Sequence, residues 1–190
     1  MKVILGTQNP HKVTEISRLL HSRAPWVQLE TTRGPSPDED GESFGENALL
    51  KARAAFDYSG TTSIADDSGI EVSALNGRPG IFSARYSDSG DDLSNNLKLL
   101  SELEGISDRR AVFVCAAAIV WVGSELVIER RWAGKIASDL RGTGGFGYDS
   151  LFIPNEFSVT SAQLSPEQKE RFSHRGQAFR AVAETLASLR

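Results

Sequence analysis

Two adjacent aspartates, Asp66 and Asp67, follow a short apolar run and precede Ser68 and Gly69. Successive side chains of a strand point to opposite faces of its sheet, so one carboxylate can face a metal-bound phosphate while the other contacts the backbone or a neighbouring helix. A buried charge needs such a partner. Magnesium uses one or two carboxylates with substrate oxygens and water, which this pair can provide. A turn or a helix cap is the structural alternative.

A second polar cluster lies near the N-terminus. Its members are Thr7, Gln8, Asn9, Pro10, His11 and Lys12. Asn9 is a good N-cap and proline suits the first helical position, so this loop delivers a helix N-terminus. Free N–H groups and the helix dipole at such a terminus suit a phosphate, and the lysine adds a positive charge. An ordinary helix cap remains the structural alternative.

A glycine-rich segment, 142–147, formally satisfies G-x-G-x-x-G. A dinucleotide-binding loop follows a strand and opens a helix, whereas this segment precedes the strand-like run 151–153. It is not a P-loop either, because Tyr148 stands where that motif has lysine. A loop presenting Phe146, Tyr148 and Asp149 suits stacking on a flat heterocycle and hydrogen bonding to it. A tight turn without a ligand is the alternative.

Two further clusters carry weaker signals. The acidic run 38–42 is typical of a solvated loop, and a metal site is the less frequent reading. His174 and Arg175, at a predicted helix start, can donate to a base carbonyl or a phosphate, or form a cap and a surface arginine. With three histidines and one cysteine, the chain argues against a zinc site.

The hydrophobic pattern places these clusters at the ends of predicted elements. Strands are predicted at 3–5, 27–30, 62–65 and 151–153, and a hairpin is predicted from 110–122 and 125–136. Helices are predicted after Asn9 and at 43–58, 93–103, 166–171 and 176–189. Helix-linked strands together with a hairpin predict one α/β domain with a mixed sheet. Ligands usually bind at strand ends in such sheets.

Composition narrows the function classes. The chain has 190 residues, with 21 Lys and Arg against 25 Asp and Glu, so its net charge is −4. A nucleic-acid binder normally shows a basic excess, so we expect no nucleic-acid partner. The length predicts a single domain. Cys115, the only cysteine, lies in an apolar run and suits a buried thiol in a reducing cytosol.

No targeting or membrane segment is predicted. The apolar stretch before Gly6, residues 3–5, has only three residues, too few for a signal-peptide core. The longest apolar run, 111–122, is shorter than the roughly 20 residues that span a bilayer. We therefore expect a soluble, cytoplasmic protein without a membrane partner.

Taken together, the clusters resemble the inosine/xanthosine triphosphate pyrophosphatase family, enzymes that hydrolyse deaminated purine nucleoside triphosphates. The resemblance is carried, in family order along the chain, by segments 7–12, 44–52, 65–70, 75–86, 144–149 and 173–176. A single segment of this kind would be weak support, whereas the ordered set is highly specific.

The resemblance implies a fold and a reaction. The fold would be a single elongated α/β domain over 1–190, with a long mixed sheet flanked by helices that form two lobes with a central cleft. The protein would usually be a homodimer. The reaction would be Mg²⁺-dependent hydrolysis of ITP, dITP and XTP to the monophosphate and pyrophosphate, which keeps non-standard purines out of DNA and RNA.

The resemblance also implies roles for individual residues. Asp67 would be the general base and a metal ligand, and Ser68 would contact the substrate. The triphosphate would be bound by Thr7, Gln8, Asn9, Pro10, His11 and Lys12. The purine would be held by Phe146, Gly147, Tyr148, Asp149, His174 and Arg175, and Lys169 matches a substrate lysine of the family. A further metal ligand falls at either Asp38 or Glu39, and the sequence leaves both open.

Two positions depart from the family pattern. Ser150 stands where proline is usual, and Gln177 stands where lysine is common, but neither change removes an assigned role. Two other functions remain as alternatives. One is a pyrophosphatase for modified pyrimidine nucleotides on a related fold, and the other is a nucleotide-binding sensor without turnover.

Overall fold

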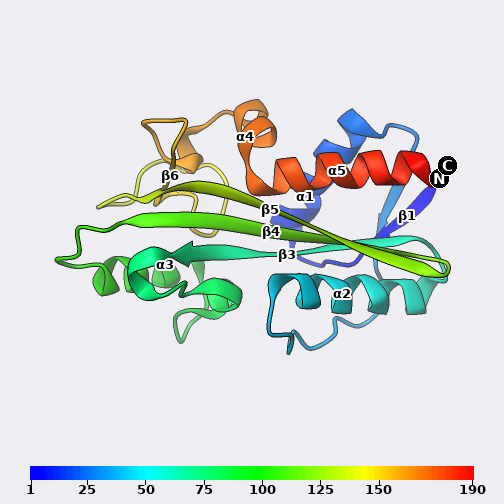
Figure 1. Cartoon of the computed structure of the whole chain (residues 1–190), viewed down its shortest axis with the longest axis horizontal. Helices are drawn as coiled ribbons and strands as arrows, with labels where there is room; N and C mark the ends of the chain where they lie inside the picture. Colours follow the sequence, from blue (N-terminus) through cyan, green and yellow to red (C-terminus); the bar gives the residue numbers. More distant parts are fainter. The chain divides into compact units, whose positions relative to one another are not determined.

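A computed structural model describes residues 1–190 and contains one six-stranded sheet in the order β2-β1-β3-β4-β5-β6 (Figure 1). The strands are β1 (Lys2–Leu5), β2 (Gln28–Thr31), β3 (Ser63–Val72), β4 (Arg110–Trp121), β5 (Ser124–Ile136) and β6 (Phe152–Pro154). β1 pairs in parallel with β2 and β3, whereas β5 and β6 are antiparallel. The predicted mixed α/β sheet is therefore confirmed.

Five α-helices accompany the sheet, close to the predicted positions. They are α1 (Pro10–Arg23), α2 (Phe44–Ser59), α3 (Asp92–Glu102), α4 (Pro166–Phe172) and α5 (His174–Ser188). Three 3₁₀ helices were not predicted: η1 (Ser73–Leu75), η2 (Gly80–Arg85) and η3 (Ser161–Gln163). None of these helices combines the length and hydrophobicity needed to cross a bilayer.

The third strand is longer than the sequence predicts. We expected it to end at residue 65, before a polar turn, but β3 runs on through both aspartates to Val72. Its later residues Ile70 and Val72 are buried in a hydrophobic core, and this burial outweighs the turn preference of Asp-Ser-Gly. The two aspartates therefore lie within a strand, where neighbouring side chains must point to opposite faces.

Contacts divide the chain into two compact units built from separate segments. Unit 1 contains Met1–Asp67, Cys115–Arg130 and His174–Arg190, and unit 2 contains Ser68–Val114 and Arg131–Ser173. Each of β3, β4 and β5 contributes residues to both units. That the chain acts as one nucleotide-processing domain stays a prediction.

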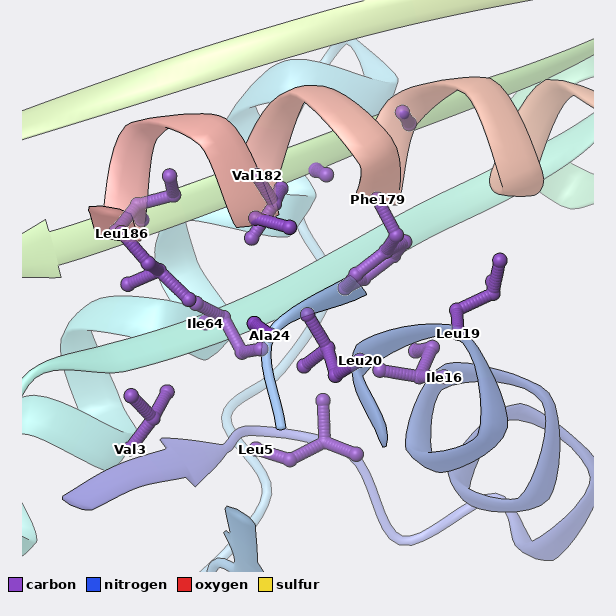
Figure 2. Close-up of a cluster of buried hydrophobic side chains, with 14 of the residues drawn as sticks. Val3, Leu5, Ile16, Leu19, Leu20, Ala24, Ile64, Phe179, Val182 and Leu186 are labelled. Atoms are coloured by element: carbon purple, nitrogen blue, oxygen red, sulfur yellow. The ribbon is translucent and has the colours of Figure 1, made fainter. Parts of the chain in front are cut away.

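The core of unit 1 joins α1 and α5 to the sheet. Figure 2 shows Phe179, Val182 and Leu186 of α5 in one cluster with Ile64 of β3 and Leu20 of α1. In Figure 1, α2 lies on the other side of this part of the sheet. β3 is thus covered on both faces in unit 1, so polar groups on either face must find protein partners.

The core of unit 2 is rich in aromatic residues. Phe152 of β6 packs against Phe113 with ring centroids 4.5 Å apart and against Trp132 at 5.3 Å. Tyr148, which directly follows the glycine-rich segment, belongs to the same core together with Leu99 of α3. This packing fixes the end of the glycine-rich segment against the rest of unit 2.

Candidate active site

The two aspartates of β3 face opposite sides of the sheet, as strand alternation predicts. Asp66 is fully buried and contacts residues of α1 and α5, whereas Asp67, 6% exposed, contacts residues of α2. Each carboxylate therefore anchors a separate cluster in unit 1.

Asp67 shares a lysine with an acidic residue of the preceding loop. Lys51 Nζ lies 2.9 Å from Asp67 Oδ1 and 2.7 Å from Glu39 Oε1. The second Asp67 oxygen accepts a hydrogen bond of 3.4 Å from Asn47 Nδ2. Two carboxylates thus converge on one buried cation.

Burial and charge act in opposite directions on this pair. Burial raises the pKa of Asp67 above its ordinary value, although Lys51 and Lys12 partly offset that rise. Burial alone would lower the pKa of Lys51, but the charges of Asp67, Asp66 and Glu39 outweigh it and raise this pKa. The lysine therefore stays charged, and the Asp67 carboxylate is more basic than an exposed aspartate, as proton abstraction requires.

The sequence of α2 explains how Lys51 reaches this position. Asn47 and Lys51 are four residues apart, so they lie on one helix face. The helix packs closely on the residue that follows β1, because a Cβ on Gly6 would lie 2.7 Å from the Lys51 carbonyl oxygen. Ser43 caps the helix by accepting from the Glu46 amide. The glycine and the cap together set the position of the lysine beside the strand.

Asp66 organises a second set of cations. Its Oδ2 lies 3.1 Å from Lys12 Nζ and within 3.3 Å of Nε and Nη2 of Arg175. The Arg175 Nη1 group also donates to Glu15 Oε2 at 2.8 Å, and the Cys115 thiol lies 3.9 Å from Asp66 Oδ2. Burial alone would raise the pKa of Asp66, but Lys12, Arg175 and Lys51 hold it well below its usual range.

The N-terminal loop forms the predicted cap, with one difference. Asn9 is the N-cap of α1, and proline occupies the first helical position, as expected. The Asn9 side chain accepts from the amides of His11 at 3.0 Å and Lys12 at 3.2 Å. The expectation that the first-turn N–H groups are free is therefore wrong, because the asparagine that begins the helix binds them itself.

The other residues of this loop are held by local contacts. Thr7 is buried and its Oγ1 accepts from the Asn9 amide at 3.3 Å, and Gln8 Nε2 donates to the Gly34 carbonyl at 3.3 Å. His11 is exposed. Of the predicted triphosphate-binding set, Lys12 is the charged member that approaches β3.

The donor set can be tested for a metal ion. No group of three or more His, Cys, Asp and Glu side chains is arranged to hold one. The pair that converges is Asp67 with Glu39, whereas Asp38 is exposed. Two carboxylates meeting at one cation fit a sparse magnesium site completed by substrate oxygens and water.

Unit 2 holds the residues predicted to contact the base, gathered around Asp149. Its Oδ2 accepts from Lys169 Nζ at 2.6 Å and from the Phe146 amide at 2.9 Å, while Oδ1 accepts from Ser161 Oγ at 2.8 Å. A Cβ on Gly145 would lie 2.0 Å from Asp149 Oδ2. Hydrogen bonds to the Asp149 carboxylate thus hold the end of the glycine-rich segment close to this side chain.

The aromatic residues of this segment differ in exposure. Tyr148 is 4% exposed and donates from its hydroxyl to the Ser83 carbonyl at 2.9 Å, so its ring is committed to the core. Phe146 is half-buried, with Lys169 Nζ 5.4 Å from its ring centroid. Tyr148 is therefore not presented to a ligand in the way the sequence predicts, and stacking by Phe146 stays a prediction.

The remaining predicted residues lie at the ends of elements. Ser68 is half-buried and is the first residue of unit 2 on β3. His174 is buried at the start of α5 and belongs to unit 1 with Arg175. The sequence grouped Arg175 with Asp149, but within unit 1 its partners are Asp66 and Glu15.

Sequence reasoning assigned no role to Lys51, Asn47 or Glu15. A signal existed for the first two, because a lysine and an asparagine recur at helical spacing on an otherwise alanine-rich face. Polar residues on a face predicted to be buried need partners, and the acids of 38–42 and 66–67 were available. Glu15 lies on the partly buried side of α1 and gave no comparable signal.

Comparison with known proteins identifies the family. Residues 3–185 match the sequence model of the Ham1 family. The chain belongs to the Ham1 family. Among Ham1-family relatives, the dITP/XTP pyrophosphatase of Thioalkalivibrio sulfidiphilus is 47% identical over 193 residues, covering 98% of each chain. That of Leifsonia xyli is 43% identical, covering 100% of this chain and 97% of the relative.

Solved structures agree with this Ham1-family assignment. A HAM1 protein from Coxiella burnetii has a TM-score of 0.90 and 36% identity, covering 99% of both chains. A nucleoside-triphosphatase, dITP/XTP pyrophosphatase, from Mycobacterium abscessus has a TM-score of 0.76 and 43% identity, covering 96% of this chain and 98% of the other. The resemblance inferred from the sequence motifs is therefore confirmed.

Proposed function

We propose that this Ham1-family chain hydrolyses deaminated purine nucleoside triphosphates, such as dITP, ITP and XTP, to the monophosphate and pyrophosphate. The observation that carries the proposal is the buried cluster of Asp67, Lys51 and Glu39, which combines a basic carboxylate with a cation. The dITP/XTP pyrophosphatases of similar sequence give the substrate class.

The cluster suits phosphoanhydride hydrolysis. This reaction needs charge neutralisation and a positioned water more than a covalent nucleophile. Lys12 and Lys51 supply positive charge beside β3, and the N-terminal dipole of α1 adds to it. Asp67 accepts the proton of the attacking water at its carboxylate. The bond between the α- and β-phosphoryl groups then breaks, and pyrophosphate leaves.

A magnesium ion completes the proposed site. Asp67 and Glu39 are its protein ligands in this proposal, and Glu39 is preferred to Asp38 because it reaches Lys51 and is half-buried. When bound, the ion polarises phosphoryl oxygens and offsets their charge. Lys51 Nζ contacts the carboxylates of Asp67 and Glu39, the two residues that would hold the ion.

The base is proposed to be held by the glycine-rich segment, with Phe146 stacking on the ring. Lys169, in the same unit as Phe146, is the candidate donor to the 6-keto oxygen, which accepts hydrogen bonds where adenine donates them. The Asp149 carboxylate binds three groups of unit 2, so its proposed contact with the base N1–H competes with those partners. Two mismatched polar groups reject adenine by roughly 30-fold to 10⁴-fold in kcat/KM.

A pyrophosphate-release assay tests the proposal. Triphosphates of inosine, deoxyinosine, xanthosine, guanosine, adenosine and a modified pyrimidine are compared with and without Mg²⁺ and with a chelator. We expect ITP, dITP and XTP to exceed ATP by about 30-fold or more, with guanosine rejected less strongly. Equal rates for ITP and ATP contradict the proposed base reading. Binding without release indicates a sensor, and preference for the pyrimidine indicates the related enzyme.

We also propose a homodimer that acts in the cytoplasm. The family resemblance supports the dimer, and the buried, unpaired Cys115 suits a reducing compartment. Light scattering at micromolar concentration should give a mass of about twice the 20.6 kDa of one chain. A mass of one chain at all concentrations contradicts the dimer.

A further inference from the structure

One helix of unit 2, α3, binds both the backbone N–H and the backbone carbonyl of a single residue in the glycine-rich segment. The Gly147 amide donates to Asp92 Oδ2 at 2.6 Å, and the Gly147 carbonyl accepts from Asn96 Nδ2 at 2.8 Å. Asp92 and Asn96 are four residues apart in α3, so they project from one face. Two simultaneous contacts from one rigid helix fix position and orientation together.

The hydrogen bonds of the Asn96 side chain are directed at Gly147 and at its own helix. It is 2% exposed, and its amide nitrogen also donates to the Asp92 carbonyl at 2.5 Å. Its Oδ1 atom is buried without a hydrogen-bond partner. A buried acceptor without a partner is unfavourable. The two hydrogen bonds that the Asn96 amide nitrogen donates must offset this cost, so they hold the side chain in place.

The residues on either side of Gly147 are held by other parts of unit 2. The Phe146 amide donates to the Asp149 carboxylate, and the Tyr148 hydroxyl donates to the Ser83 carbonyl. Gly147 itself has a φ of 60°, a left-handed conformation that favours glycine. The Phe146 amide is thus held by a residue of the same loop, the Tyr148 hydroxyl is held by η2, and α3 holds Gly147 between them.

We propose that Asp92 and Asn96 are positioning residues that set the place of the Phe146 ring for base recognition. This inference rests on the proposed function, in which Phe146 stacks on the purine. Neither residue is proposed to touch the substrate, since both act through the Gly147 peptide. Release of that peptide changes base binding and base selectivity, while Asp67 and its partners in unit 1 are unaltered.

The chain offers a matched control in the neighbouring residue. Asn95 is also 2% exposed and lies on α3, but it contacts Ser87, Ala84 and Gly90 and not the glycine-rich segment. Asn96→Asp keeps the shape of the side chain and removes the donor to Gly147, and Asn95→Asp makes the same chemical change next to it. Any loss of stability caused only by burying a new carboxylate should appear in both variants, so a difference between them reports the contact with Gly147.

We expect Asn96→Asp to raise KM for ITP by about tenfold and to contract the ITP/ATP ratio of kcat/KM by a similar factor, with kcat for ITP within about threefold. Asn95→Asp should leave the ratio unchanged. Asp92→Ala is the second variant, because Asp92 is exposed and we expect its substitution to leave the fold intact. It should shift the ratio in the same direction.

A structural readout separates this inference from the proposed function. Hydrogen exchange at the Gly147 amide should be faster in Asp92→Ala than in the wild type, whichever nucleotide is hydrolysed. Failure of the wild type to release pyrophosphate from ITP contradicts the proposed function alone. Faster exchange at Gly147 together with an unchanged KM and ITP/ATP ratio overturns the inference. Unchanged exchange overturns it as well.

Discussion

Lys51 lies between Asp67 and Glu39. Because Asp67 is the proposed general base, we expect turnover to depend on it more than on its two neighbours. Asp67→Asn should keep substrate binding within a fewfold and lower kcat by roughly 10² to 10⁴, because an amide cannot accept the proton of water. Nucleotide binding by calorimetry and pyrophosphate release measure the two effects separately. Retention of more than about a tenth of the wild-type kcat would exclude Asp67 as the base.

Asp66 controls stability at low pH. Its folded-state pKa lies well below the roughly 3.9 expected for an unfolded chain, because Lys12 and Arg175 outweigh the effect of burial. The unfolded chain therefore takes up the proton first, so the carboxylate stabilises the fold above about pH 4 and loses this effect as the pH falls towards the folded pKa.

Asp66→Asn tests this contribution. The difference in free energy of unfolding between the wild type and the variant should shrink as the pH is lowered from 7 to 3. Urea unfolding at each pH measures it. The surface ion pair of Lys2 and Glu30 offers a control, since Glu30→Gln should show only a small difference at any pH. A pH-independent difference for Asp66→Asn would contradict the prediction.

Residue-scale prediction from sequence succeeded where local geometry decides. The opposite facing of Asp66 and Asp67 follows from strand alternation, and the Asn9 cap follows from side-chain chemistry. The partners of those aspartates did not follow, because Lys51 and Arg175 are 16 and 109 residues from the carboxylates they contact. Such contacts depend on which helix covers which face of the sheet.

At the scale of elements, the glycine-rich segment is shaped by two glycines under different constraints. Gly145 and Gly147 both have positive φ, of 75° and 60°, but only Gly145 faces a nearby group, Asp149. Gly147→Ala should cost about 1–2 kcal/mol for the left-handed backbone alone. Gly145→Ala should cost about 1–3 kcal/mol more, because the added carbon displaces the carboxylate from its partners.

Urea unfolding of the two alanine variants measures this difference. Lys169 provides a second check, because displacement of Asp149 also removes the 2.6 Å ion pair between them. Lys169→Met should therefore destabilise the Gly145→Ala variant less than the wild type. Equal destabilisation by the two glycine substitutions would show that Asp149 does not set the shape of the segment.

Element boundaries were predicted from caps and hydrophobic periodicity, and the helices agree closely for that reason. β3 was misjudged because the tertiary burial of Ile70 and Val72 overrides a local turn signal. η2 was missed because its sequence lacks a helical period. Its Ser83 instead binds the Ile70 amide and the Gly80 carbonyl, contacts that depend on the folded unit.

For the molecule as a whole, the two units share three strands and neither is a continuous stretch of chain. We therefore expect one cooperative unfolding transition, as for a single domain. The three tryptophans allow a direct test, because Trp26 and Trp121 belong to unit 1 and Trp132 to unit 2. Trp132→Phe leaves reporters in unit 1, and Trp26→Phe combined with Trp121→Phe leaves one in unit 2.

Each set of reporters is followed by fluorescence and compared with circular dichroism of the same variant. Coincident midpoints within each variant confirm a single transition and support one domain over 1–190. A fluorescence midpoint well separated from the circular dichroism midpoint would show that the units unfold independently.

The surroundings of Cys115 make its rate of alkylation a measure of how often the fold opens around β4. The thiol is fully buried in β4, and burial together with Asp66 raises its pKa far above the ordinary value. Alkylating reagents attack the thiolate, so the folded molecule should be inert to them. Every labelling event then records an excursion in which β4 leaves its neighbours. Because the sequence has one cysteine, mass spectrometry of the intact protein gives the fraction of molecules that have opened and been labelled at each time.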